Sequence, residues 1–334
     1  MTTTNYLWVE KYRPATIKDY VWINPTQKLM VEGWVKDKSI PHLLLSGPPG
    51  TGKTTLAKVL CNELEVQKAD IMFINASHET GVDNLREKVS NFCRSMAFGD
   101  FRVIILDEAD YLSPNAQGVL RGMLEQYSNV ARFILTCNMP HKVMPALHSR
   151  CQGFSFNNLD ETEFTVRLGQ ILADEGCDFD VETLTSFVKA TYPDLRKAIN
   201  TAQQYSRSGK LELPAAGQGT DSSEWKLEAI ALFQNGKVRQ AREMICKKIT
   251  LEEYEEVYKF LYRNLAFWGD DEDTQDAAII IIKEGMVNHS LCADPEINLS
   301  ATIVKLDRMR RGLSSKVDYP KLTITYDLLF TVNL

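Results

Sequence analysis

Eight residues of the amino-terminal half read Gly47-Pro48-Pro49-Gly50-Thr51-Gly52-Lys53-Thr54. They match the pattern G-x-x-x-x-G-K-[ST] at every fixed position. In such a loop, glycines let backbone N–H groups turn inward around phosphate oxygens, where a Cβ would clash. The lysine reaches the β- and γ-phosphates of a nucleotide, and the threonine hydroxyl holds Mg²⁺. This stretch predicts a site for ATP with Mg²⁺; a chance glycine-rich turn is the alternative interpretation.

The residues on either side of this loop favour phosphate binding. Residues 42–46 form a short apolar run, as expected of a buried parallel strand. Apolar side chains then recur at helical spacing and predict a helix over residues 55–64. A strand, a glycine loop and a helix N-terminus together form an anion site. Thr55, which opens the predicted helix, is therefore another candidate for nucleotide binding.

Further apolar runs predict buried strands at residues 71–75, 101–106 and 131–137. Helical patterns separate these runs, and a short strand is expected to end at Phe156. Alternation of strands and helices predicts an α/β fold with a parallel sheet. In such a sheet the carboxyl ends of the strands face the crevice that binds the ligand.

Two acidic residues, Asp107 and Glu108, follow the predicted strand over residues 101–106. Asp107 fits a carboxylate that holds Mg²⁺ beside the phosphates. Glu108, one residue further, suits a general base that polarises the attacking water. A solvated acidic turn is the alternative interpretation.

Asn138 and Arg196 are two further candidates, each with an ordinary alternative. Asn138 ends the strand over residues 131–137, where an amide can position the hydrolytic water or can cap the loop before Pro140. Arg196 is expected in the first turn of a helix, where a cation opposes the helix dipole. That placement indicates an anionic partner such as ATP, or a salt bridge to Asp194.

An aromatic, basic and proline-containing segment precedes the nucleotide fold and contains Tyr12 and Arg13. It can wrap an adenine base, or it can be a surface arm that packs its aromatic side chains on the domain. On the helix predicted over residues 113–127, Gln117, Arg121 and Glu125 recur four residues apart on one face. This polar row is either a solvated face or a hydrogen-bonded junction.

Composition restricts the class of protein. The chain has 334 residues, which favours two or three domains. No apolar run approaches the ~20 residues of a membrane-spanning helix, and no secretory signal is evident, so we expect no membrane contact and no export. The seven cysteines and five histidines form no ligand-spaced set, so reduced thiols and no structural zinc are expected.

Charge is unevenly distributed. Residues 1–157 carry 17 Lys and Arg against 15 Asp and Glu, whereas the remainder carries 21 against 29. The net charge of −6 argues against a chain coated in nucleic acid. A local basic groove stays compatible with it, because binding depends on where the charges lie.

With these motifs in place, residues 9–200 resemble the AAA+ clamp loader ATPase subunits. The replication factor C small subunits and the clamp-loader large subunit of T-even-like phages are the similar groups. The specific features are Val9-Glu10-Lys11-Tyr12-Arg13-Pro14, the acidic run at residues 107–110 and Ser149-Arg150-Cys151. The resemblance implies ATP-driven opening of a ring-shaped sliding clamp and its loading onto primer-template DNA during replication, viral if the source is a phage.

The resemblance also implies roles for single residues. Arg150 is a finger that reaches the ATP site of a neighbouring subunit, Asn138 is sensor 1, and Arg196 is sensor 2. Tyr12 and Arg13 lie near the base. The alternative for Arg150 is an ordinary ion pair with an acid such as Glu125 or Asp160.

The family plan implies a P-loop domain at residues 1–157 and a small helical lid at 158–206. A linker at 207–224 and a helical collar at 225–312 follow, and the tail at 313–334 is unassigned. Five subunits form a spiral joined by their collars, so the chain is expected to be part of a hetero-oligomer. The location is the host cytoplasm for a phage protein, and the nucleoid or nucleus for a cellular one.

The resemblance implies contacts with DNA and with the clamp. Thr80, Gly81 and Arg86 lie at a helix N-terminus that tracks DNA phosphates in the family, and such contacts read no bases. Residues 91–98 resemble the apolar segment that grips the clamp, and the candidates in it are Phe92, Met96 and Phe98. Core packing is the other interpretation of this segment.

Two other functions compete with clamp loading. Another AAA+ motor, such as a branch-migration helicase or a helicase loader, shares the ATP site but lacks the motif around Arg150. A scaffold subunit without hydrolysis should have lost Lys53, Asp107 or Glu108, and the sequence retains all three.

Overall fold

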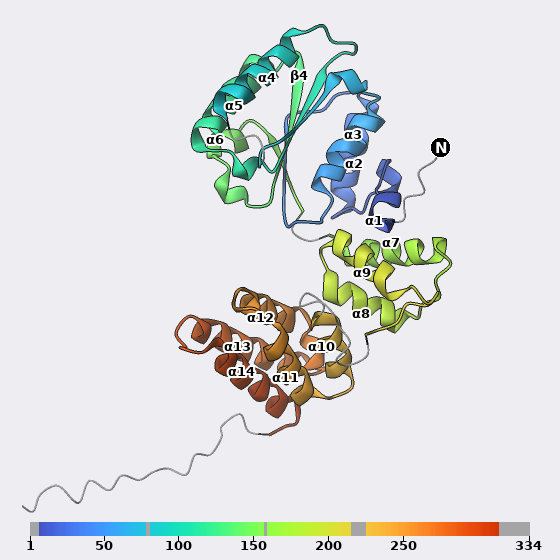
Figure 1. Ribbon diagram of the computed structural model, residues 1–334, viewed down its shortest axis with the longest axis vertical. Coiled ribbons are helices and arrows are strands. Elements are labelled where there is room, and N and C mark those ends of the chain that lie inside the picture. The colour runs from blue at the N-terminus through green and yellow to red at the C-terminus, as the bar shows by residue number, and fades with distance from the viewer. Residues whose placement is uncertain (1–6, 78–80, 157–158, 215–224, 314–334) are drawn as a thin grey trace, which may run out of the picture. The chain divides into compact units, whose positions relative to one another are not determined.

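The computed structural model describes residues 7–77, 81–156, 159–214 and 225–313 (Figure 1). The chain divides into two compact units, one of residues 1–212 and one of residues 213–334. The first unit is an α/β domain followed by three helices, and the second is helical throughout its described residues. The predicted fold class, with its parallel sheet, is confirmed.

A five-stranded parallel sheet forms the centre of the first unit. Its strand order is β2-β3-β4-β1-β5. Both faces are covered by helices, which is why the strands are continuous apolar runs rather than alternating ones. The strands are β1 (Leu43–Ser46), β2 (Ile71–Asn75), β3 (Arg102–Asp107), β4 (Ala131–Cys137) and β5 (Gln152–Ser155).

The strand register brings the predicted site residues to one edge of the sheet. Ser46 at the end of β1 pairs with Cys137 at the end of β4. Leu106, one residue before the end of β3, pairs with Leu135 of β4. The residues that end or follow these strands therefore converge at the carboxyl edge, where ligands bind in open α/β sheets.

Helices cover the sheet on both sides, with α4 and α5 on one side and α2 and α3 on the other (Figure 1). One hydrophobic core cluster joins α4 and α5 to β2, β3 and β4, with Leu85, Val89, Leu120 and Phe133 among its buried members. The helices before the lid are α1 (Trp8–Lys11), α2 (Pro25–Lys36), α3 (Lys53–Glu63), α4 (Val82–Arg94), α5 (Pro114–Gln126) and α6 (Pro145–His148).

Three helices complete the first unit: α7 (Glu161–Asp174), α8 (Val181–Thr191) and α9 (Leu195–Tyr205). Each begins after an aspartate whose carboxylate accepts a backbone N–H bond in the first turn, as N-caps do. This unit extends beyond residue 206, where the sequence placed the end of the lid. The backbone of Lys210 forms an isolated parallel β-bridge with that of Asp178, and Leu211 is buried. The chain therefore stays packed against this unit until residue 212.

Five helices form the second unit in its described residues: α10 (Trp225–Gln234), α11 (Val238–Lys248), α12 (Tyr254–Arg263), α13 (Glu272–His289) and α14 (Pro295–Arg310). Trp225 and Trp268 are fully buried and anchor its core. The segment over residues 225–312 stays a predicted collar, and its described residues are helical. The β-prone tail from Lys316 lies outside the described residues.

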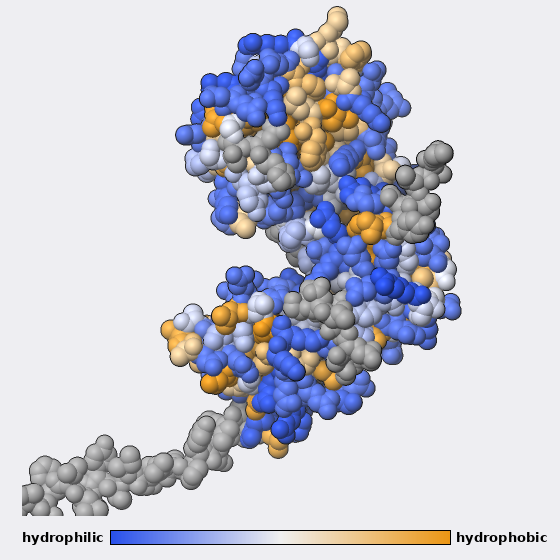
Figure 2. Space-filling model, in the orientation of Figure 1, coloured by the Kyte–Doolittle hydropathy of each residue, from blue (hydrophilic) through white to orange (hydrophobic). Residues whose placement is uncertain are grey.

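The surface of each unit is mixed in character. The face shown in Figure 2 is largely hydrophilic with scattered hydrophobic areas, as is normal for folded domains. No helix among the described residues is both long enough and apolar enough to cross a membrane. Each of the seven cysteines is a free thiol, and four of them are buried.

Candidate active site

The phosphate loop connects β1 to α3 and depends on two glycines in left-handed conformations. Gly50 has φ +75° and Gly52, the N-cap of α3, has φ +91°. A Cβ on Gly50 would lie 1.8 Å from Oδ1 of Asp194, and one on Gly52 would lie 3.0 Å from the Tyr20 hydroxyl. Glycine is therefore needed both for the backbone conformation and for the close approach of neighbouring elements.

Lys53 lies at the start of α3 and is almost fully buried in the loop. Its ammonium group donates to the backbone oxygens of Gly47 and Pro48, each at 2.7 Å. Burial lowers the pKa of Lys53 to about 8, although nearby Asp107 and Asp110 favour the charged form. The cation is thus held where phosphate oxygens would meet the loop.

This pKa predicts that ATP binding takes up protons in mildly alkaline solution. In the free chain part of the Lys53 population is unprotonated at pH 8, and phosphate charges would raise its pKa and restore the proton. We expect proton uptake at pH 8 and clearly less at pH 6.5. Calorimetric titration in buffers of different ionisation enthalpy measures this uptake. Lys53→Arg is the matched control, because arginine stays charged; equal uptake in both proteins would contradict the assignment.

Thr54 and Asp107, the two residues predicted to hold magnesium, are hydrogen-bonded to each other. The Thr54 hydroxyl donates to Oδ1 of Asp107 at 2.6 Å, and the Thr136 hydroxyl donates to the same oxygen at 2.6 Å. A hydroxyl and a carboxylate oxygen are hard ligands of the kind that Mg²⁺ takes, with the remaining positions left to water and phosphate. The donor set thus fits Mg²⁺ bound together with a nucleotide.

Glu108 has the strained backbone that functional sites tend to contain. Its φ of 58° and ψ of 43° place a non-glycine residue in the left-handed region. The backbone N–H of Glu108 donates to Thr136 Oγ1 at 3.0 Å, so β4 fixes this conformation. The turn therefore presents the Glu108 side chain, which is half-buried, at the carboxyl edge next to Asp107.

Asn138 is held by a buried carboxylate that sequence reasoning did not single out. Oδ2 of Asp110 accepts the backbone N–H groups of Asn138 at 3.2 Å and Met139 at 2.9 Å. Met139, not Asn138, is the N-cap of the short helical turn at Pro140–Lys142, and no side chain caps it. The Asn138 side chain is thus not used as a cap and stays available to the site.

A pocket beside the phosphate loop gathers residues from three parts of the first unit. The amino-terminal segment contributes Tyr12 and Arg13, the loop and α3 contribute Gly50 and Thr55, and α9 contributes Arg196. The two residues predicted to lie near the base, Tyr12 and Arg13, thus line the same cavity as Arg196. The segment is tethered by α7, because an Arg167 N–H donates to the backbone oxygen of Tyr12 at 3.1 Å.

Tyr20 and Arg167 also line this pocket, and sequence reasoning missed both. Tyr20 is buried and its hydroxyl donates to the backbone oxygen of Gly52 at 3.2 Å. Neither residue carries a local motif, since each reaches the pocket only through the packing of distant segments. No signal in the sequence identifies them.

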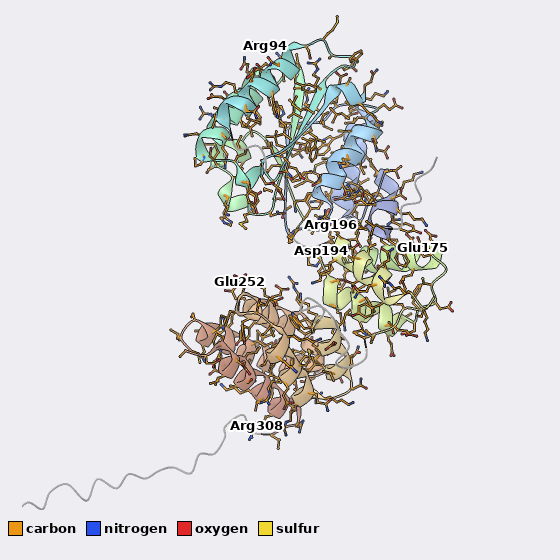
Figure 3. All side chains as sticks on the ribbon, viewed as in Figure 1. Arg94, Glu175, Asp194, Arg196, Glu252 and Arg308 are labelled. Carbon is orange, nitrogen blue, oxygen red and sulfur yellow. The ribbon has the colours of Figure 1, made fainter. Side chains whose placement is uncertain are left out.

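Asp194 and Arg196 lie together at the start of α9, beside the phosphate loop (Figure 3). Oδ1 of Asp194 accepts the backbone N–H of Lys197 at 2.9 Å and caps the helix, and burial raises the pKa of this carboxyl. In the part of the chain that the structure describes, Arg196 forms no ion pair with Asp194, and it is exposed. The positive charge of Arg196 nevertheless favours the ionised form of Asp194, so the two predicted roles of Arg196 stay open.

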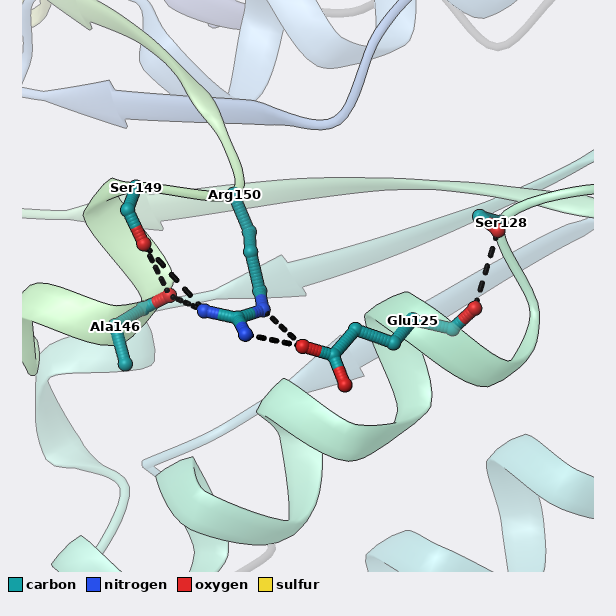
Figure 4. A network of polar contacts seen from close by, with 5 residues as sticks. All are labelled: Glu125, Ser128, Ala146, Ser149 and Arg150. Carbon is teal, nitrogen blue, oxygen red and sulfur yellow. Dashed lines mark hydrogen bonds and ion pairs between the residues drawn. The ribbon is translucent and has the colours of Figure 1, made fainter.

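Arg150 pairs with an acidic residue of its own chain (Figure 4). Its Nε donates to Oε1 of Glu125 at 2.6 Å, and Nη2 contacts the same oxygen. Nη1 donates to the backbone oxygen of Ala146 at 2.9 Å. The ordinary alternative predicted for Arg150 is thus present in the single chain, on a partly exposed surface.

The polar row on α5 serves two purposes. Gln117 is buried; its amide donates to the backbone oxygens of Leu112 and Lys142, and its oxygen accepts from Met144 N–H at 2.7 Å. Gln117 is therefore a hydrogen-bonded junction. Glu125 lies at the surface with its oxygen on Arg150.

The residues predicted to contact DNA and those predicted to contact the clamp differ in location and in exposure. Gly81 is the N-cap of α4 and Arg86 is exposed on that helix, whereas Thr80 lies outside the described residues. Met96 and Phe98 are exposed at 92% and 71%. Phe92 differs from them, because it packs against the core cluster and is only partly accessible.

Comparison with known proteins agrees with this geometry. Residues 43–159 match the model of the ATPase family associated with various cellular activities (AAA). The replication factor C small subunit of Aeropyrum pernix is 36% identical over 322 residues, covering 92% of this chain and 97% of that protein. The corresponding Methanococcus vannielii protein is 36% identical over 332 residues, covering 96% and 98%.

Solved structures agree in fold. A variant of Thermotoga maritima RuvB superposes with a TM-score of 0.52 at 13% identity, covering 86% of this chain and 90% of that chain. The Thermotoga maritima RuvB Holliday junction branch migration motor gives a TM-score of 0.52 at 14% identity, covering 80% and 85%. At such low identity the likeness extends to the fold alone.

Proposed function

The chain belongs to the family of replication factor C small subunits, and we infer from this membership that it is an ATPase subunit of a sliding-clamp loader in DNA replication. ATP binding and hydrolysis then drive opening of the ring-shaped clamp and its placement on primer-template DNA. The likeness to RuvB adds no support for a branch-migration activity, since it concerns the fold alone.

One observation carries the assignment of a working ATP site. The Thr54 hydroxyl, the Asp107 carboxylate and the strained turn at Glu108 come together at the end of the phosphate loop. A scaffold subunit that never hydrolyses ATP would have no need of the Glu108 carboxylate next to Asp107 at this edge of the sheet. We assign the site to hydrolysis on this basis.

In this proposal the chain's own residues act as follows. Thr54 and Asp107 would hold Mg²⁺, which would neutralise charge on the nucleotide phosphates when bound. Lys53 adds a cation to the same phosphates, and Glu108 accepts a proton from the attacking water. Asn138 orients that water from the end of β4.

Residues around the pocket bind the rest of the nucleotide and link neighbouring subunits. Tyr12 and Arg13 lie against the base, and Arg196 contacts phosphate from the lid. Arg150 of one subunit completes the ATP site of the next one in a five-membered spiral. The nucleotide-binding domain comprises residues 1–157, and the helices of residues 225–312 join the subunits as a collar.

The proposed partners contact different elements. The N-terminus of α4, with Gly81 and the exposed cation Arg86, tracks DNA phosphates without reading bases. The exposed side chains Met96 and Phe98 contact the clamp. Because the proposed substrate is replicating DNA, we expect the protein in the compartment that holds the replicating genome. Steady-state ATPase measurement with and without clamp and primer-template DNA tests this function.

A further inference from the structure

A buried carboxylate holds the turn that follows α4. Asp70 is fully buried immediately before β2. Its Oδ2 accepts the backbone N–H of Phe98 at 2.9 Å and that of Gly99 at 2.8 Å. Phe98 N–H also lies 3.2 Å from Oδ1 of the same carboxylate. Two consecutive amides of an exposed turn are thus bound by one internal group.

A buried cation supports this carboxylate and contacts the helix before the turn. Arg102, the first residue of β3, is almost fully buried, and its Nε lies 3.4 Å from Oδ1 of Asp70. Its guanidinium group stacks over the Phe92 ring at 4.9 Å from the centroid. Phe92 belongs to the last turn of α4. The Asp70–Arg102 pair therefore fixes the chain on both sides of residues 95–97.

The segment between these two fixed points exposes large apolar side chains. Met96 and Phe98 are 92% and 71% exposed, and hydrophobic surface lies at this end of the first unit (Figure 2). Apolar side chains on a free turn would fold back onto the protein to escape water. A buried ion pair also adds little to folding stability, because well-packed apolar residues of similar volume often stabilise the fold equally well. The pair is better explained by the turn that it holds.

We propose that Asp70 is a positioning residue, which with Arg102 behind it presents Met96 and Phe98 to the sliding clamp. The inference rests on the proposed clamp contact of this segment. The buried pair of Asp70 and Arg102 fixes the shape of the contact surface, and the two exposed side chains touch the clamp. Phe92 does not touch the clamp; its ring packs against the guanidinium group of Arg102.

The position of Asp70 separates its effect from ATP chemistry. Asp70 immediately precedes β2 and Arg102 begins β3, so both residues lie at the amino edge of the sheet. Asp107 ends β3 and lies at the carboxyl edge. A six-residue strand spans roughly 20 Å. In Figure 3, Arg94 at the end of α4 is correspondingly far from Arg196 at the ATP pocket. A change at Asp70 should leave the ATP site intact.

The test compares variants of the full chain in the assembled loader. Asp70→Ala removes the acceptor, Asp70→Asn keeps an oxygen acceptor without the charge, and a Met96→Ser, Phe98→Ser double variant removes the contact itself. Asp100→Ala is the matched control, since Asp100 is an exposed carboxylate beside the same turn. Clamp affinity with a non-hydrolysable ATP analogue, ATPase without clamp, and hydrogen exchange at the Phe98 and Gly99 amides are measured.

We expect Asp70→Ala to weaken clamp binding about tenfold or more, as loss of oriented anchor side chains does. The double serine variant should lose a similar amount, Asp70→Asn should lose less, and Asp100→Ala should stay within about twofold. ATPase without clamp should be unchanged in all of them. The Phe98 and Gly99 amides should exchange faster in Asp70→Ala. If that variant does not fold, Asp70→Asn takes its place in the comparison.

Two results would overturn the inference, and they are distinguishable. Clamp affinity kept by the Asp70 variants but lost by the double serine variant would show that the segment contacts the clamp without needing Asp70. Affinity kept by both would show that the proposed clamp contact is itself wrong. Either result leaves the ATPase assignment untouched, because the ATPase without clamp is measured separately.

Discussion

Glu108→Gln should bind ATP with unchanged affinity and hydrolyse it about 10²–10⁴-fold more slowly than the native chain. The amide keeps the size of the side chain but cannot accept a proton from water. The backbone conformation should persist, because the bond from Glu108 N–H to Thr136 does not involve the side chain. The variant should accumulate in the ATP-loaded, clamp-bound state.

Equilibrium ATP binding and single-turnover hydrolysis measure the two effects separately. Glu65→Gln is the matched control, because Glu65 is also a glutamate with positive φ, at 55°, but lies exposed in a surface ion pair with Lys38. It should hydrolyse ATP normally. A Glu108→Gln rate within about twofold of the native rate would mean that another group is the base.

Arg150→Ala should produce the other large effect, and the effect should appear in a neighbouring subunit. A finger supplied in trans is worth roughly 10³–10⁵-fold in analogous GTPases. In the single chain Arg150 pairs with Glu125, but both side chains are partly exposed and such surface pairs contribute only about 0–1 kcal/mol. The guanidinium can thus leave Glu125 at little cost when a phosphate is offered by the next subunit.

Mixing two defective proteins tests the interfacial role. Arg150→Ala subunits keep their own ATP sites, and Lys53→Ala subunits keep their fingers. Mixed assemblies should regain hydrolysis at interfaces where an intact site meets an intact finger. Glu125→Ala removes only the partner within the chain and should stay within a few fold of native activity. No recovery in assemblies shown to be mixed, or full activity of Arg150→Ala alone, would contradict the finger assignment.

The sheet and the phosphate loop were predictable because their signals are local. The strand predicted at residues 71–75 and the one at residues 131–137 have the observed bounds, since buried parallel strands are short apolar runs. Asp107 follows from the same logic, because a carboxylate that ends a parallel strand must face the crevice. The register then adds Thr136, which lies beside Asp107 and could have been found by aligning strand ends.

Other features depend on contacts between distant segments, and no local pattern reveals them. Tyr20 and Arg167 reach the pocket only through packing of the amino-terminal segment and α7. The sequence suggests Asp194 as an ion-pair partner of Arg196, whereas in the folded chain its carboxylate caps α9 and lies against Gly50. In the sequence Phe92 is not distinguishable from the exposed Met96 and Phe98, but in the structure its ring packs against the guanidinium group of Arg102. Burial of one side chain among three similar ones is decided by the fold.

If this chain hydrolyses ATP as part of a clamp loader, its steady-state ATPase rate must depend on the clamp and on DNA. ATPase activity of the assembled loader is compared without additions, with the sliding clamp, with primer-template DNA, and with both. We predict that clamp and primed DNA together stimulate hydrolysis well above either alone, and that Lys53→Ala abolishes the stimulated rate. Hydrolysis that is indifferent to clamp and DNA, or that survives in Lys53→Ala, would contradict the account.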